Sequence, residues 1–123
     1  MYHKDLEAWK KSINLVTAVY SEIKKFPEDE RFGLISQIKR AAISIPSNIA
    51  EGAARYSDKE MLRFLDISLG SLAELETQFI IAENLGYFNN EKLYETFNEN
   101  FAIINGLKKY LLKKTQSLNH SIT

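Results

Sequence analysis

The chain has 123 residues, equal numbers of basic and acidic side chains (16 each) and no cysteine. This length suits one domain. The zero net charge excludes a strong overall field toward nucleic acid or anionic membranes, and the lack of cysteine excludes disulfides, thiolate metal sites and a cysteine nucleophile.

Hydrophobic segments are short throughout the sequence. No apolar run is long enough to span a membrane, and the first residues carry charge without the apolar core of a secretory signal. We therefore expect a cytoplasmic, bacterial-type protein without a membrane partner. We expect residues 1–123 to form a single domain whose polar tail, from about Thr115 to Thr123, frays.

The first predicted helix runs from about Asp5 to Lys25. Its apolar residues step alternately by three and four positions, which predicts one buried stripe. This stripe consists of Leu6, Trp9, Ile13, Val16, Tyr20 and Ile23, widened by Leu15, Val19 and Phe26. Pro27 ends the helix, because the residue before a proline is disfavoured in the α region.

The second predicted helix starts near Glu28 to Arg31 and is apolar over much of its girth. Its stripe consists of Leu34, Ile38, Ala41, Ile45, Ile49 and Gly52. Pro46 lies in the middle, where it lacks an N–H and its ring presses on the preceding turn, so we expect a kink. An alternative is a break into two helices at Ser44 to Asn48. We favour one kinked helix, because the apolar spacing keeps its phase across Pro46.

The third predicted helix begins at a capping box formed by Ser57 and Glu60 and ends before Gly86, a favoured C-terminal cap. Asn89 or Asn90 caps the fourth helix. The stripes of these helices are Leu62, Leu65, Leu69, Leu72, Leu75, Phe79 and Ala82, then Leu93, Phe97, Phe101, Ile104, Leu107 and Leu111. Four helices with short connections predict an all-α, antiparallel up-down four-helix bundle.

Catalytic and metal-binding patterns are missing from this sequence. The two histidines, His3 and His120, lie near the termini, and neither has the spacing of a di-iron or zinc motif. Isolated helical glutamates such as Glu51, Glu74 and Glu76 are usually solvated or salt-bridged. We therefore expect no catalytic residue, no metal and no cofactor, and we expect that the protein is not an enzyme.

A line of polar residues crosses the apolar second helix. Spacings of four, four and three place Arg40, Ser44, Asn48 and Glu51 on one line. We interpret it as a buried network that fixes helix register, in which Arg40 pairs with Glu74 or Glu76, and Ser44 or Asn48 satisfies backbone groups freed by Pro46. The alternative is a small-molecule or enzymatic site near Arg40, Asn48 and Glu51.

Two further groups of residues suggest binding surfaces. The apolar Ile43, Ala50 and Ala54 lie off the stripe of the second helix, and Gly70, Ala73 and Thr77 form a small-residue flank on the third. Together they exceed what one bundle needs, so we expect a heterologous interface between copies, which closes into a ring.

Four lysines gather near the end of the fourth helix. They are Lys108, Lys109, Lys113 and Lys114. The cluster is a candidate for a weak nucleic-acid patch. The favoured alternative is that these lysines complement the helix dipole at its C-terminal end.

The segment Gln37 to Gly52 reads Gln-Ile-Lys-Arg-Ala-Ala-Ile-Ser-Ile-Pro-Ser-Asn-Ile-Ala-Glu-Gly. It resembles the signature of the 23S rRNA-intervening-sequence protein family, also called the four-helix bundle protein family. Shorter matches support the resemblance, among them Asp5-Leu6, Phe26-Pro27, Phe32-Gly33-Leu34, Gly70-Ser71-Leu72 and Leu85-Gly86-Tyr87.

The resemblance implies a four-helix bundle that assembles into a ring-shaped homopentamer. It also implies a link to RNA or to an RNA-handling protein, because genes of the family can lie inside intervening sequences of ribosomal RNA genes. Our leading hypothesis is accordingly an oligomeric interaction scaffold. A purely structural homo-oligomer that awaits a protein partner is a further alternative.

Overall fold

The computed structural model describes residues 1–122, with the side chains of residues 1–117. Within this part, all regular structure is helical. The α-helices are α1 (Glu7–Ile23), α2 (Leu34–Ala53), α3 (Asp58–Asn84) and α4 (Glu91–Ile122), and two short 3-10 helices are η1 (His3–Asp5) and η2 (Glu28–Glu30). The predicted all-α class and the four helices are confirmed.

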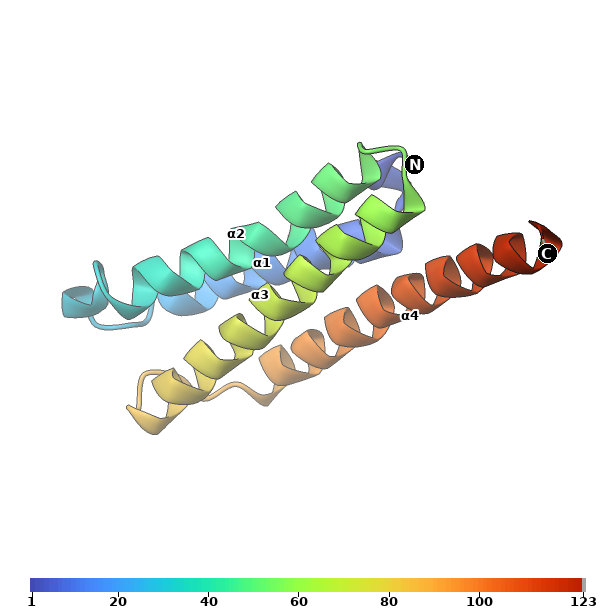
Figure 1. Cartoon of the computed structure of the whole chain (residues 1–123). Coiled ribbons are helices and arrows are strands. Elements are labelled where there is room, and N and C mark those ends of the chain that lie inside the picture. Colours follow the sequence, from blue (N-terminus) through green and yellow to red (C-terminus); the bar gives the residue numbers. More distant parts are fainter. Residues whose placement is uncertain (123) are drawn as a thin grey trace.

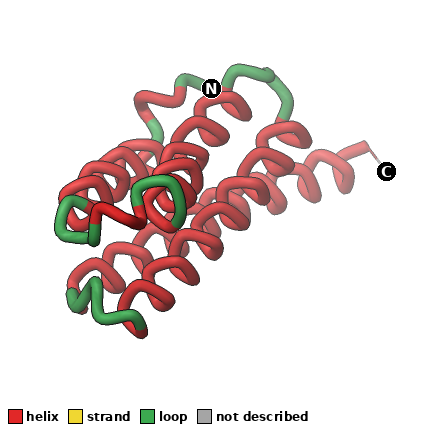
Figure 2. Tube along the Cα trace, turned by 90° about the vertical axis from the view of Figure 1, so that its left-hand side faces the viewer, coloured by secondary structure: helices red, strands yellow, loops and turns green. Residues whose placement is uncertain are grey.

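Each α-helix packs against the next one along the chain, and α4 also packs against α1, which closes the bundle. Figure 1 shows that successive helices run in opposite directions, and Figure 2 shows the loops gathered at the two ends of the bundle. The contact between α2 and α3 is the most extensive in the molecule.

The second helix begins later than predicted, at Leu34 instead of Glu28 to Arg31. The acidic residues of this region form the separate 3-10 turn η2. Gly33 separates this turn from α2, because its φ of −105° and ψ of −109° lie outside the helical region. The amide of Gly33 donates to the carbonyl of Glu30, 3.1 Å away, which closes the turn. The acidic turn and the helix are therefore two elements.

Pro46 lies inside one continuous helix, so the single-helix interpretation is correct and the two-helix alternative is wrong. The proline is buried, and the helix continues for seven residues beyond it, to Ala53. The kink at Pro46 stays a prediction.

The predicted caps at the other helix ends are largely confirmed. The hydroxyl of Ser57 accepts from the amide of Glu60 (3.3 Å), and the side chain of Asn90 accepts from the amide of Lys92 (3.1 Å). Gly86 has φ +82°, and the amide of Tyr87 donates to the carbonyl of Ala82 (2.9 Å), as a Schellman motif requires.

Only half of the predicted capping box forms. The carboxylate of Glu60 binds Arg63 at 2.9 Å, on the next turn of the same helix. This hydrogen bond outweighs the effect of desolvation and, helped by the charge of Arg63, holds the pKa of Glu60 below its usual range. The carboxylate of Glu60 therefore binds a side chain of the following turn, and not the backbone amide of Ser57 at the helix start.

The core stripe predicted for the first helix is only partly correct: Ile23 and the widening residues Leu15, Val19 and Phe26 are buried, but the centre of the stripe is not. The residues of α1 that are buried are Ala8, Ser12, Leu15, Val19 and Ile23. Trp9, Val16 and Tyr20 are half-buried, and Ile13 is exposed. The helix carries two apolar stripes side by side, and the smaller residues Ala8 and Ser12 allow the second stripe to face the core. Most residues of the other three predicted stripes are buried.

The predicted fraying from Thr115 concerns motion and stays a prediction. The backbone of α4 continues as helix to Ile122, and the hydroxyl of Thr115 donates to the carbonyl of Leu111 (2.9 Å). Thr123 lies outside the described residues.

Helices α2 and α3 pack closely together at Gly52. A Cβ atom at this position would lie 2.8 Å from the sulfur of Met61 and 2.8 Å from the Cβ of Phe64. Real Cβ atoms do not make contacts this short, so any side chain here would force the two helices apart. The glycine at the end of the signature segment therefore serves the packing of α2 on α3.

We expect Gly52→Ala to destabilise the protein by about 1–3 kcal/mol, because the added methyl group overpacks the contact. The matched control is Gly106→Ala on α4, where no atom lies within 4 Å of the new Cβ. There the better helix propensity of alanine should stabilise by up to about 1 kcal/mol. Urea unfolding followed by circular dichroism compares the two, and equal effects of both changes would contradict the close-contact account.

Candidate functional site

The centre of the predicted polar line forms a cluster between α2 and α3. The side-chain amide of Asn48 donates to the carbonyl and the hydroxyl of Ser44 (2.7 and 2.9 Å), and the hydroxyls of Ser44 and Ser71 lie 2.7 Å apart. The hydroxyl of Ser68, fully buried, donates to the carbonyl of Ile45 (2.9 Å). We call Ser44, Asn48, Ser68 and Ser71 the serine–asparagine cluster.

The cluster surrounds Pro46 but does not satisfy the carbonyl that the proline frees. A proline at position 46 removes the donor to Ala42, whereas the cluster donates to the carbonyls of Ser44 and Ile45. The hydrogen bonds therefore join two helices next to a proline. Ser68 was not identified from the sequence; its polar side chain within the apolar stripe of α3 was the available signal.

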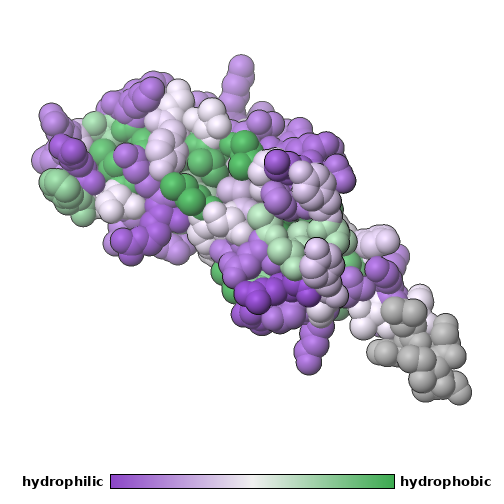
Figure 3. All heavy atoms as spheres, turned by 90° about the horizontal axis from the view of Figure 1, so that it is seen from above, coloured by the Kyte–Doolittle hydropathy of each residue, from purple (hydrophilic) through white to green (hydrophobic). Residues whose placement is uncertain are grey.

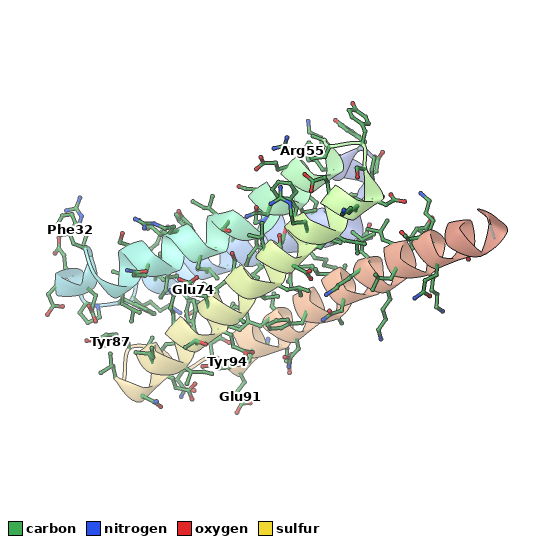
Figure 4. All side chains as sticks on the ribbon, in the orientation of Figure 1. Phe32, Arg55, Glu74, Tyr87, Glu91 and Tyr94 are labelled. Atoms are coloured by element: carbon green, nitrogen blue, oxygen red, sulfur yellow. The ribbon has the colours of Figure 1, made fainter. Side chains whose placement is uncertain are left out.

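The two ends of the polar line do not join the cluster. Arg40 is exposed and forms no ion pair or hydrogen bond among the described residues, so the expected pairing with Glu74 or Glu76 is wrong. Glu51 instead binds Arg55 at 2.9 Å on the surface of its own helix. Figure 4 shows Arg55 at the end of α2, well away from Glu74 in the middle of α3. The line is thus one internal cluster and two separate surface charges.

Half of the lysine cluster on α4 is engaged within the chain. Lys108 binds Asp66 at 2.6 Å, and Lys114 binds Asp58 at 3.3 Å, so both tie α4 to α3. Lys109 and Lys113 are exposed and form no ion pair with any described residue. The cluster therefore offers two free cations and not four.

An apolar groove runs along the outside of α1 and α2, which we call the outer groove. Its volume is about 340 Å³, and it is lined by Trp9, Ile13, Val16, Ile43, Pro46, Ser47 and Ala50. Ile13 and Ile43 are 37% and 48% exposed. Figure 3 shows apolar atoms in a broken band on the side of the molecule where α2 lies. Much of the stripe predicted for the core of α1 lines this groove.

The outward face of α3 combines small residues with isoleucines. Gly70, Ala73 and Thr77 are exposed, and no atom lies within 4 Å of the position of a Cβ on Gly70. The isoleucines Ile67, Ile80 and Ile81 on this helix are 40–46% exposed. Within the chain, these small residues therefore do not serve a close contact. Ala54, at the end of α2, is also exposed.

A second pocket, of about 490 Å³, lies where α1, η2 and α2 meet, and we call it the basic corner. It is lined by Tyr20, Ile23, Lys24, Phe26, Glu28, Arg31, Ile35 and Lys39. The ammonium of Lys39 lies 5.4 Å from the centre of the Tyr20 ring, a cation–π distance. The adjacent Phe32 is 89% exposed and stands at the tip of the molecule in Figure 4. Sequence reasoning missed this pocket, because Lys24 follows α1, Arg31 follows η2 and Lys39 lies on α2.

The C-terminal half of α3 carries carboxylates without a cationic partner. Glu74, Glu76 and Glu83 form no ion pair with any described residue; Glu74 accepts from Gln78 (3.2 Å) and Glu83 from the hydroxyl of Tyr94 (2.6 Å). Burial, then the hydrogen bond to Glu83, raises the pKa of Tyr94 well above its usual range. Figure 4 shows Tyr94 beside this end of α3.

Metal and membrane sites find no support in the described part of the chain. No three histidine or acidic side chains there gather closely enough to hold a metal ion. His3 packs its ring on Trp9 at 5.1 Å, and the side chain of His120 lies outside the described residues. Among residues 1–122 no helix combines the length and the apolar character needed to cross a membrane.

We expect Ser68→Ala to destabilise the protein by about 1 kcal/mol more than Ser21→Ala, because only Ser68 gives up a buried hydrogen bond. Ser21 is exposed on α1 and undergoes the same change in helix propensity, so it is a matched control. Urea unfolding of the two variants measures the difference. If both variants unfolded at the same urea concentration, the bond to Ile45 would carry no net stability.

Comparison with known proteins shows which proteins share this fold. A structure of a protein of unknown function from the S23 ribosomal protein family of Bacteroides thetaiotaomicron superposes with a TM-score of 0.65 and 23% identity, covering 86% of this chain and 95% of that one. The likeness supports the same fold. No curated protein gives a match. The family model described as 23S rRNA-intervening sequence protein matches residues 4–109, so the chain belongs to this family.

Proposed function

We propose that this protein is a non-enzymatic scaffold that assembles with copies of itself into a closed ring. The single observation that carries the proposal is the outer groove, which exposes Ile13 and Ile43 beside the buried Pro46. Contiguous apolar surface of this kind on a folded domain marks a site of association. The resemblance of the signature segment supports five copies in the ring.

The distribution of apolar surface favours a ring over a symmetric dimer. The outer groove lies along α1 and α2, whereas the small-residue face with Gly70, Ala73 and Thr77 lies on α3. When two different faces of one protein bind each other, each copy can bind one neighbour on either side. Such contacts close into a ring when the rotation between neighbours allows it.

The polar line supports a structural role over catalysis. Ser44 and Asn48 are used for hydrogen bonds between and within helices, and Glu51 is paired with Arg55. A small-molecule site near Arg40, Asn48 and Glu51 would need these groups to converge on a shared cavity. Instead, the outer groove and the basic corner are lined by other residues.

We expect Ile43→Asp to convert the assembly into monomers, because the change places a charge in the apolar groove while a side chain 48% exposed can be replaced without unfolding the chain. The control is Leu112→Asp on α4, 42% exposed and outside the groove. Sedimentation velocity gives the mass, and circular dichroism checks the helices. A wild-type protein that sediments as a monomer at micromolar concentration would overturn the proposal.

The cargo of the scaffold that we propose is RNA. The family description refers to a 23S rRNA intervening sequence, and Lys109 and Lys113 are two exposed lysines without an ion pair in the described chain. Two cations per chain bind RNA weakly, but a ring repeats the pair in every copy, and repetition raises the overall avidity.

If Lys109 and Lys113 contact RNA phosphates, the double change to glutamate should weaken binding to 23S rRNA fragments at least tenfold and reduce its salt dependence. Fluorescence anisotropy at several salt concentrations measures both effects. The matched control is Lys10→Glu with Lys25→Glu, which changes the same charge at exposed lysines already paired with Glu7 and Glu22. Wild-type protein that does not bind these fragments at low salt would refute the RNA part alone.

A further inference from the structure

We propose that the outer groove and the basic corner of one copy receive the outward face of α3 from the next copy. In this contact the cations of the basic corner meet the exposed carboxylate of Glu74, on the C-terminal half of α3. The inference rests on the proposed self-assembly and adds to it the identity of the two faces and the charges that set their register.

Neither charged group forms an ion pair inside the described chain. Lys24, Arg31 and Lys39 line one pocket and form no ion pair with a described residue. The same holds for Glu74, Glu76 and Glu83 on α3. Six ion pairs join other lysines and arginines of the described chain to carboxylates, while Arg40, Lys109 and Lys113 are unpaired as well. The basic corner also contains the carboxylate of Glu28, so its three cations leave it with a net positive charge. One face therefore carries net positive charge and the other carries negative charge, as complementary interfaces do.

The contacts between α2 and α3 show which residues lie at the same height in the bundle. Ser44 meets Ser71, whereas Gly52, eight residues further along α2, meets Phe64, seven residues earlier on α3. The two helices therefore run antiparallel. Three residues forward along α3 from Ser71 is Glu74, which lies level with Ala41, three residues back along α2 from Ser44. Lys39 is two residues further back along α2, so Lys39 and Glu74 lie within about 3 Å of the same height.

A ring whose axis runs along the bundle preserves these heights between neighbours. The basic corner of one copy then lies level with the acidic half of α3 of the next copy. By the same count from Ser44 and Ser71, Ser47 in the outer groove lies level with Ser68. Ser68 is one residue from Ile67 and two from Gly70. The apolar groove therefore lies level with the isoleucine and glycine part of α3, and the charged parts coincide as well.

The open space at Gly70 supports this docking. Gly70 is exposed on α3, and its backbone has no neighbour within 4 Å of the Cβ position, unlike Gly52. A helix surface made of glycine, alanine and threonine allows the side chains of a second surface to approach the backbone closely. Exposed isoleucines such as Ile43 provide such side chains on the outer groove. Apolar contact then supplies affinity, and the charges select one register among several.

Charge reversal tests the inference in the full-length protein. In a ring of identical chains, Lys39→Glu puts like charges into every interface, and Glu74→Lys does so from the other side. We expect each change to raise the protein concentration at which the assembly dissociates at least tenfold at low salt. The double variant Lys39→Glu with Glu74→Lys restores opposite charges in every interface and should recover most of the loss.

The control for altered net charge is Lys92→Glu, an exposed lysine on the first turn of α4. Static light scattering over a dilution series gives the dissociation concentration, and circular dichroism confirms that each variant is folded. An assembly that tolerates both single reversals would overturn this inference and leave the proposed self-assembly standing. Single reversals that are not rescued by the double variant would also overturn the pairing. Wild-type monomers would refute the self-assembly itself.

The competing use of the basic corner is nucleic-acid binding, which its cations and aromatic rings also suit. In that case Lys39→Glu would abolish binding to a short single-stranded RNA, measured by anisotropy, while the mass of the assembly stayed unchanged. This outcome would overturn the proposed contact between copies and assign the pocket to nucleic acid.

Discussion

The structure depends on the close approach of α2 and α3 at Gly52. Because a Cβ there would lie 2.8 Å from Phe64, only glycine allows the two helices to meet. The same approach brings the hydroxyls of Ser44 and Ser71 to 2.7 Å and that of Ser68 to the carbonyl of Ile45. The close contact and the hydrogen bonds together fix the relative height of the two helices. That height determines whether the outer groove and the basic corner lie level with the outward face of α3.

How much could be predicted from the sequence depended on the range of the interaction. Local signals were sufficient for the caps at Ser57 and Gly86, because a hydroxyl before a helix and a left-handed glycine act within a few residues. The core of α1 was predicted only in part, because Ile13 and Leu15 belong to two adjacent stripes of similar hydrophobicity, and only that of Leu15 is buried. Only the packing of the other helices decides which of the two is buried, so periodicity could not choose.

The candidate site was predicted in part for the same reason. The signature segment identified the region around Pro46, since its polar residues stand out on an apolar helix. Arg40 and Glu51 shared the spacing of Ser44 and Asn48, yet they end at the surface, because spacing on one helix does not say which neighbours lie opposite. The basic corner was not predicted, because Lys24, Arg31 and Lys39 come together only when the turn η2 joins α1 to α2.

The central claim is that the exposed apolar faces are covered by other copies of the chain. Native mass spectrometry of the unmodified protein tests it most directly, because it counts chains in each particle. The account predicts one dominant species with five times the chain mass of 14.2 kDa. A spectrum of monomers alone, at micromolar concentration and near-physiological ionic strength, would contradict it.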